Sequence, residues 1–193
     1  GEVIATATDT YDYWSGTSMS APNYTGVMAL LLGEHTENVD GKLVVNEGYI
    51  KSINARTMST ADQMDDKYGL DASVRIQGAG MVNVAAALDS EVYLEGVANS
   101  GKAKIELGNN VDIAEGNLKL SFVAHNEGEA KTYNAKVKVY RPTIYRYERR
   151  ENSKESLAIN NVELQAITNT LIAEVDVTIN VPTGESTINL DTI

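Results

Sequence analysis

One short segment contains residues whose types and order could carry out chemistry. In Ser15-Gly16-Thr17-Ser18-Met19-Ser20-Ala21-Pro22, a glycine stands two residues before Ser18, and an apolar run follows. A serine that opens a helix lies beside free backbone N–H groups and the positive end of the helix dipole. Such N–H groups can hold the oxyanion that forms when a serine hydroxyl attacks a carbonyl. A serine that merely caps a helix has the same local pattern, so the wider string must decide between the two.

The helix that has to position Ser18 is predicted over residues 17–33. Ser18 and Ser20 can cap its start, and Pro22 fits a first helical turn. Residues 27–32 are apolar on every side of the helix, which predicts burial rather than an amphipathic surface helix. If other chain segments do not cover this run, a bare apolar face results. We therefore expect an upstream segment, a dimer or a swapped assembly to cover it.

The chain divides into two parts with different patterns. Residues 1–90 read as helix and loop, with further helices predicted over 46–57 and 82–88. From residue 91 onward, apolar and polar residues alternate with the period of a β-strand. This predicts an antiparallel β-sandwich over residues 91–193. Strands are expected at 92–96, 102–107, 118–124, 133–140, 145–147, 162–167, 171–181 and 187–190.

The serine segment resembles a family signature over its whole length. Gly16-Thr17-Ser18-Met19-Ser20-Ala21-Pro22 is similar to the nucleophile motif of the subtilisin-like serine proteases (subtilases), Gly-Thr-Ser-Met-Ala/Ser-x-Pro. Residues 1–6 resemble the strand that precedes this motif, and residues 77–83 resemble the Gln-Gly-x-Gly stretch that closes many subtilase domains. The resemblance implies that residues 1–90 are an α/β fragment, the C-terminal part of a subtilase catalytic domain with its nucleophile helix.

The resemblance also implies roles for individual residues. Ser18 matches the catalytic nucleophile, and Gly16, Thr17 and Ser18 match the oxyanion and substrate loop. In this family the catalytic triad residues occur along the chain in the order Asp, His, Ser, and an Asn side chain that donates to the oxyanion also precedes the serine. The resemblance therefore implies that the Asp, the His and the oxyanion Asn would lie upstream of Gly1. No cofactor is required. Structural calcium in the parent protein is not assigned to any residue, and the acidic stretch Asp62, Asp65, Asp66 and Asp71 is expected to be a solvated loop.

The sequence departs from the family pattern in its histidines. No histidine precedes Ser18, and both His35 and His125 follow it. His35 comes just after the predicted helix and His125 on or beside a predicted strand, and each is expected to be a surface-loop histidine. Asp9 and Asp12 precede Ser18 but match no triad position, so we expect them in a surface turn. A serine without its base loses several orders of magnitude in rate. This chain alone is therefore predicted to be inactive.

Three segments after residue 91 carry a second resemblance: Gly101-Lys102-Ala103-Lys104-Ile105-Glu106-Leu107, Val123-Ala124-His125-Asn126 and Val181-Pro182-Thr183-Gly184-Glu185-Ser186. On these segments, residues 91–193 resemble a fibronectin-III-like domain, which follows the catalytic domain in cell-envelope subtilases similar to C5a peptidase and lactocepin. The resemblance implies a bacterial parent protein that is extracellular or associated with the cell wall. The leading hypothesis is the C-terminal part of a secreted subtilisin-like serine endopeptidase, with polypeptides as substrates. A non-catalytic binding or adhesion module, a pseudo-protease fragment and a lipase-like hydrolase with a histidine near Ser18 are the alternatives.

The composition of the chain excludes several classes of protein. A content of 42% hydrophobic and 22% charged residues is that of a globular chain, and a net charge of −11 argues against nucleic-acid binding. The chain has no cysteine, which excludes disulfides and thiolate metal sites. The longest apolar run has six residues, far short of the roughly 20 that a membrane span needs. The chain opens with no signal peptide and is expected to be a piece of a longer protein.

Overall fold

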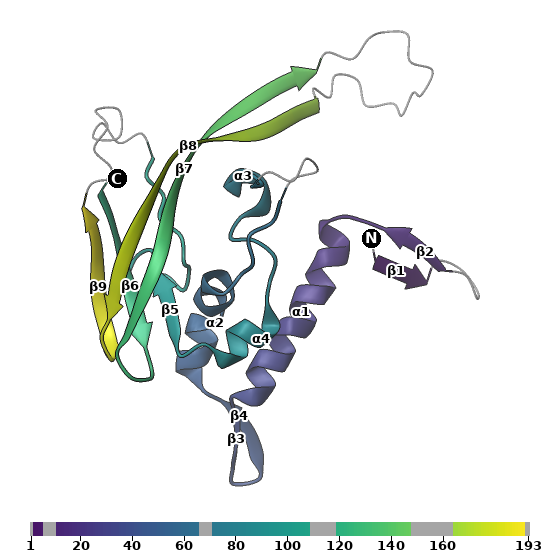
Figure 1. Cartoon of the computed structure of the whole chain (residues 1–193). Helices are drawn as coiled ribbons and strands as arrows, with labels where there is room; N and C mark the ends of the chain where they lie inside the picture. The colour runs from purple at the N-terminus through teal and green to yellow at the C-terminus, as the bar shows by residue number, and fades with distance from the viewer. Residues whose placement is uncertain (1, 6–10, 66–70, 109–118, 148–163, 192–193) are drawn as a thin grey trace.

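The computed structural model describes residues 2–5, 11–65, 71–108, 119–147 and 164–191 (Figure 1). These residues combine helices with antiparallel sheets, so the described chain is mixed α and β. The helices are α1 (Thr17–Glu34), α2 (Glu47–Ser59), α3 (Val74–Gln77) and α4 (Val84–Asp89). The strands are β1 (Glu2–Ala5), β2 (Tyr11–Trp14), β3 (Thr36–Val39), β4 (Lys42–Val45), β5 (Val92–Glu95), β6 (Lys119–Asn126), β7 (Lys131–Tyr147), β8 (Leu164–Val181) and β9 (Gly184–Asp191).

The predicted helix over residues 17–33 is confirmed as α1, but its start is built differently from the prediction. Gly16 is the N-cap, and its carbonyl oxygen accepts from Met19 N at 3.0 Å and Ser20 N at 3.1 Å. Ser20 Oγ donates to the same oxygen at 3.2 Å, so the expected capping by Ser18 or Ser20 is wrong. Pro22 lies inside the helix. Because the backbone of Gly16 begins the helix, the Ser18 hydroxyl is left without a capping role.

The helices predicted at 46–57 and 82–88 are confirmed as α2 and α4. Asn46 caps α2, because its side-chain oxygen accepts from Gly48 N at 2.8 Å and from Tyr49 N at 3.2 Å. This satisfies two of the free N–H groups in the first turn. A small core joins α1, α2 and α4, and it consists of Leu31, Tyr49, Ile53 and Ala87 with Val27, Met28 and Leu32 at its margin.

The expected burial of the second half of α1 is wrong for the described chain. Leu31 is fully buried, but Leu30 beside it is 64% exposed. The reason is geometric, since α2 and α4 cover only one side of α1 and successive helical residues point in different directions. Among the described residues, nothing covers the remaining side of this apolar helix.

The strand expected at residues 1–6 is present as β1, but the prediction of helix and loop for the rest of residues 1–90 missed β2 and the β3–β4 hairpin. β1 pairs with β2 and β3 pairs with β4, both antiparallel. Asp40 (φ 51°) and Gly41 (φ 78°) connect β3 to β4. Two consecutive positive φ values form a type I′ turn, for which Asp-Gly is a preferred pair. The signal for this hairpin was therefore present in the sequence.

The second part of the chain contains two antiparallel sheets. β5, β6 and β9 form one sheet, and β7 pairs with β8 in a separate two-stranded ribbon. Antiparallel β structure is thus confirmed, whereas a fibronectin-III-like sandwich is not. Residues 102–107 form no strand, and the strands predicted at 133–140 and 145–147 are continuous in β7. Pro142 does not end β7, because a two-stranded ribbon has open edges that tolerate proline.

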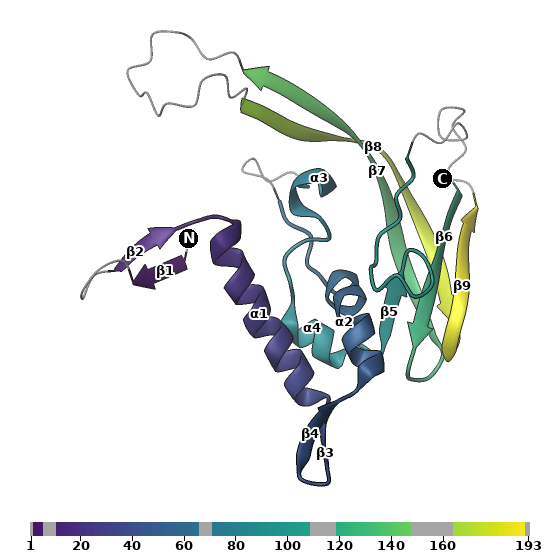
Figure 2. The same ribbon diagram turned by 180° about the vertical axis from the view of Figure 1, so that it is seen from behind.

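The β7–β8 ribbon reaches from the sheet toward α3 (Figures 1 and 2). Its pairing register changes between Val139 and Tyr140. At this point Lys138 Nζ lies 3.0 Å from Asp71 Oδ2, and the Tyr140 hydroxyl donates to the same carboxylate. Asn169 Nδ2 donates to the Asp71 carbonyl oxygen at 3.4 Å. These bonds attach the ribbon to the segment that precedes α3.

Candidate active site

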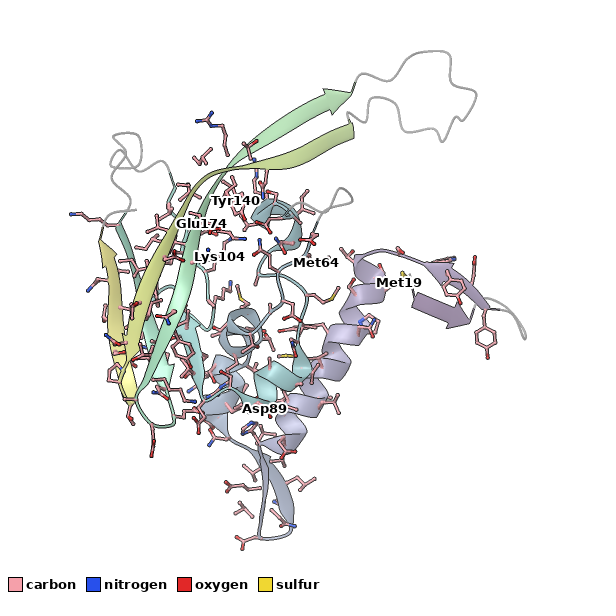
Figure 3. The ribbon with its side chains drawn as sticks, in the orientation of Figure 1. Met19, Met64, Asp89, Lys104, Tyr140 and Glu174 are labelled. Atoms are coloured by element: carbon pink, nitrogen blue, oxygen red, sulfur yellow. The ribbon has the colours of Figure 1, made fainter. Side chains whose placement is uncertain are left out.

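Ser18 lies in the first turn of α1 and is exposed. Figure 3 labels its neighbour Met19, at the end of α1 that lies next to the β1–β2 hairpin. Among the described residues, none accepts a hydrogen bond from Ser18 Oγ or from the backbone N–H groups of Thr17 and Ser18. A free hydroxyl beside free helix N–H groups can attack a carbonyl and hold the negative charge that develops on its oxygen.

The backbone before Ser18 is open to approach. Gly16 is extended, with φ 161° and ψ 171°. A Cβ built on Gly16 would meet no described atom within 4 Å. Gly16, Thr17 and Ser18 are all exposed, so an extended polypeptide could reach the segment without displacing a described side chain.

The aspartates before Ser18 provide no triad carboxylate in the described structure. Asp9 lies outside the described residues. Asp12 is exposed as expected, although on strand β2 rather than in a turn. Its carboxylate accepts from Tyr13 N at 2.8 Å and from Trp14 Nε1 at 3.2 Å. Asp12 therefore supports the local conformation of its own strand.

His35 is the C-cap of α1, at the opposite end of the helix from Ser18. With a rise of 1.5 Å per residue, about 25 Å of helix separates the two residues. The His35 ring stacks on Tyr49 with 3.5 Å between ring centroids, and His35 is half-buried. His35 is thus part of a packed cluster rather than of a surface loop, and it cannot act as a base for Ser18.

His125 is likewise not a surface-loop residue. It lies on β6, its side chain is 17% exposed, and its ring stacks on Tyr93 with centroids 4.5 Å apart. His125 Nε2 lies 3.0 Å from Glu95 Oε2. β6 and the first turn of α1 lie at opposite sides of the molecule in both views (Figures 1 and 2). The lipase-like alternative, which required a histidine close to Ser18, is therefore contradicted for both histidines.

Glu95 is a buried carboxylate that the sequence reasoning did not single out. Only 4% of the residue is exposed, and burial by itself would raise its pKa. Hydrogen bonds from Gly101 N at 2.7 Å and Asn99 N at 2.8 Å, together with His125, outweigh burial and lower the pKa of Glu95. The sequence feature that could have pointed to Glu95 is its position at the end of a short apolar strand. The geometry shows a structural group, remote from Ser18.

A groove of about 770 Å³ runs beside the first turns of α1, between α1, the end of α2 and the segment before α4. Gly80 forms part of its wall with φ +124°, and a Cβ there would lie 2.2 Å from the Asp62 carbonyl oxygen. Close packing against the Asp62 backbone therefore explains this glycine. The groove is lined by Ser20, Asn23, Tyr24, Val27, Thr57, Met58, Ala61, Ala79, Gly80, Met81, Val82 and Val84.

The acidic stretch before α3 makes bonds to protein groups. Asp62 Oδ2 accepts from Asn83 Nδ2 at 3.1 Å, and Asp71 binds the β7–β8 ribbon as described above. Asp71 is therefore a contact residue and not part of a solvated loop, whereas Asp62 and Asp65 are exposed; Asp66 lies outside the described residues. Within the described ranges, no group of three or more His, Cys, Asp or Glu side chains is arranged to hold a metal ion.

In the described portion, none of the helices combines the length and apolar character that would be needed to span a bilayer.

Comparisons with known proteins address the first part of the chain. No curated protein matches the chain. Residues 3–80 match the family model of the subtilase family, a peptidase family, and the matched range includes Ser18 and the whole of α1. This match supports a subtilase-like protease origin for residues 3–80.

Proposed function

We propose that this chain is the C-terminal part of a secreted subtilisin-like serine endopeptidase, with Ser18 as the nucleophile. The observation that carries the proposal is the exposed Ser18 hydroxyl beside free N–H groups, within the segment that matches the subtilase model. Ser18 Oγ would attack the carbonyl carbon of a peptide bond while a histidine takes its proton. The amine leaves with a proton returned by that histidine, and water then hydrolyses the acyl-enzyme.

The proposal requires a partner segment. The described structure brings no histidine to Ser18, since His35 and His125 are committed elsewhere. An upstream segment of the parent would supply the Asp, the His and the oxyanion Asn. It would also cover the open side of α1, where Leu30 is 64% exposed. Without that segment the chain is inactive, and its apolar face favours a dimer or a swapped assembly.

The location and the second domain belong to the same proposal. A cell-envelope subtilase would be extracellular or attached to the cell wall, and the absence of cysteine is compatible with that location. A fibronectin-III-like domain over residues 91–193 stays a prediction. The antiparallel sheets support it, and the missing strand at 102–107 counts against it. Structural calcium in the parent is not assigned to any described residue.

A fluorophosphonate probe tests the assignment of Ser18, because it labels only serines activated by a base. We expect no labelling of this chain alone and stoichiometric labelling of the parent protein that includes the upstream segment. Ser18→Ala should abolish the labelling. Ser20→Ala is the matched control, since Ser20 is also exposed in the first turns of α1 but donates to the Gly16 carbonyl. Labelling that survives Ser18→Ala, or is lost only in Ser20→Ala, would contradict the proposal.

A protein-binding module is the second candidate. The observation in its favour is the β7–β8 ribbon, which forms a two-stranded sheet in the described chain and so leaves strand edges open to another polypeptide. The coding sequence upstream of Gly1 separates the two candidates. Asp-Thr/Ser-Gly and His-Gly-Thr motifs in that order support the protease, and their absence there favours a binding module or a pseudo-protease.

A further inference from the structure

Five side chains form a continuous series of stacked contacts between α1 and β6. We call this series, which consists of His35, Tyr49, Arg56, Tyr93 and His125, the aromatic–arginine column. The His35 ring stacks on Tyr49, and the Arg56 guanidinium carbon lies 4.8 Å from the centre of the Tyr49 ring. The same carbon lies 4.3 Å from the centre of the Tyr93 ring, which in turn stacks on His125. The first three residues precede residue 90, and the last two follow it.

Arg56 is a buried cation whose partners come from both parts of the chain. Only 5% of the residue is exposed. Its Nε donates to Ser52 Oγ at 3.0 Å within α2, and its Nη2 binds the Glu127 carboxylate beyond β6. A buried charge is tolerated only when it is paired and hydrogen-bonded. Without Glu127 and Tyr93, α2 would carry an unpaired cation in its buried face.

Strand β5 in turn depends on groups of α2. Ser59 Oγ accepts from Leu94 N at 2.9 Å, while its own proton is donated within α2 to the Ala55 carbonyl oxygen at 2.7 Å. The neighbouring Tyr93 is packed between Arg56 and His125, and burial raises the pKa of its hydroxyl. Strand β5 thus obtains part of its backbone pairing and part of its packing from α2. Two independent modules joined by a linker would not share such groups.

We propose that the aromatic–arginine column joins the two parts of the chain into one cooperative folding unit, with Arg56 as the central residue. The column begins at His35, the C-cap of α1. The sheet β5–β6–β9 therefore stabilises the far end of the helix that carries Ser18, although no strand of that sheet approaches Ser18 itself.

Native-state hydrogen exchange of the whole chain in increasing denaturant tests this proposal, because it measures the opening free energy of α2 and of β6 separately. In the unmodified chain, the slowest amides of α2 and β6 should report one shared opening free energy. Tyr93→Leu changes only the second part of the chain, yet it should lower the protection of α2 amides about 30-fold. The reason is the loss of a desolvated cation–π contact with Arg56.

Two substitutions serve as controls. Tyr93→Phe keeps the ring over Arg56 and should change the protection of α2 less than threefold. Lys136→Met removes an exposed cation that pairs with Glu174 on the β7–β8 ribbon, and it should leave the protection of α2 amides unchanged.

If Tyr93→Leu does not fold, Glu127→Gln is the milder variant, since the Glu127 side chain is 57% exposed and its replacement leaves the rings in place. Different opening free energies for α2 and β6 in the unmodified chain, or full protection of α2 in Tyr93→Leu and Glu127→Gln, would overturn the proposal.

Discussion

Replacing Glu95 by Gln removes a negative charge from an otherwise unchanged buried site. In the structure, Glu95 Oε1 accepts from Gly101 N at 2.7 Å, and Oε2 accepts from Asn99 N at 2.8 Å and lies 3.0 Å from His125 Nε2. A glutamine has one acceptor oxygen and one amide NH₂ group. Whichever way the amide is turned, its NH₂ group faces one of the two backbone N–H donors.

The expected cost follows from this mismatch. One hydrogen bond to a charged group is worth about 1.5–3 kcal/mol, and the N–H that loses its acceptor remains in a buried site. We therefore expect Glu95→Gln to lower the free energy of unfolding at pH 7 by about 3 kcal/mol. Urea denaturation followed by circular dichroism measures this value. The matched control is Glu106→Gln, because Glu106 is 77% exposed in its pair with Lys104 and should not shift the denaturation midpoint.

The difference between the unmodified chain and Glu95→Gln should depend on pH in one direction. Because the folded-state pKa of Glu95 is lowered, the carboxylate contributes stability above the ordinary glutamate pKa of about 4.3. That contribution is lost as the pH falls through the lowered folded-state pKa. The two proteins should therefore differ fully at pH 7, and the difference should be smaller at pH 3, below the ordinary glutamate pKa. An equal difference at both pH values, or a difference that grows on acidification, would refute the argument.

Four further substitutions test the packing of the first part of the chain and the capping of α2. Gly80→Ala places a Cβ 2.2 Å from the Asp62 carbonyl oxygen at φ +124°, and calorimetry should show a loss of at least about 2 kcal/mol. Leu31→Ala empties a fully buried position and should cost about 3 kcal/mol in urea denaturation, whereas Leu30→Ala, at a site 64% exposed, should cost under about 0.5 kcal/mol. Equal costs for the two leucines would show that α1 is covered on both sides. Asn46→Ala removes the cap of α2 and should lower the free energy of unfolding of the chain by about 1 kcal/mol, which a lower midpoint of thermal unfolding would show. An unchanged midpoint would contradict the capping role.

Much of the local structure could be predicted from the sequence. The ranges of α1, α2 and α4 followed from the apolar pattern of residues 17–33, 46–57 and 82–88. The alternation after residue 91 predicted β6 and β9 to within a few residues, because side chains on a strand alternate between two faces. It divided β7 and β8 into two strands each, whereas both are continuous in the structure. The β3–β4 hairpin could have been found from Asp40-Gly41. Strand 102–107 was wrongly predicted, since a short alternating run does not form a strand without a neighbouring strand to pair with.

The candidate site could be predicted only in part, because Ser18 belongs to a contiguous motif, whereas a catalytic Asp and His would come from elsewhere in the parent protein. A string of neighbouring residues identifies the serine and places it at a helix start, and the sequence alone determined this. Only the tertiary structure decided that His35 and His125 lie in packed clusters, and that Arg56 is held between two tyrosines from different parts of the chain. Local patterns determine helices and strands through contacts a few residues apart. The environment of a buried charge depends on contacts such as Arg56–Glu127, 71 residues apart, which no local pattern encodes.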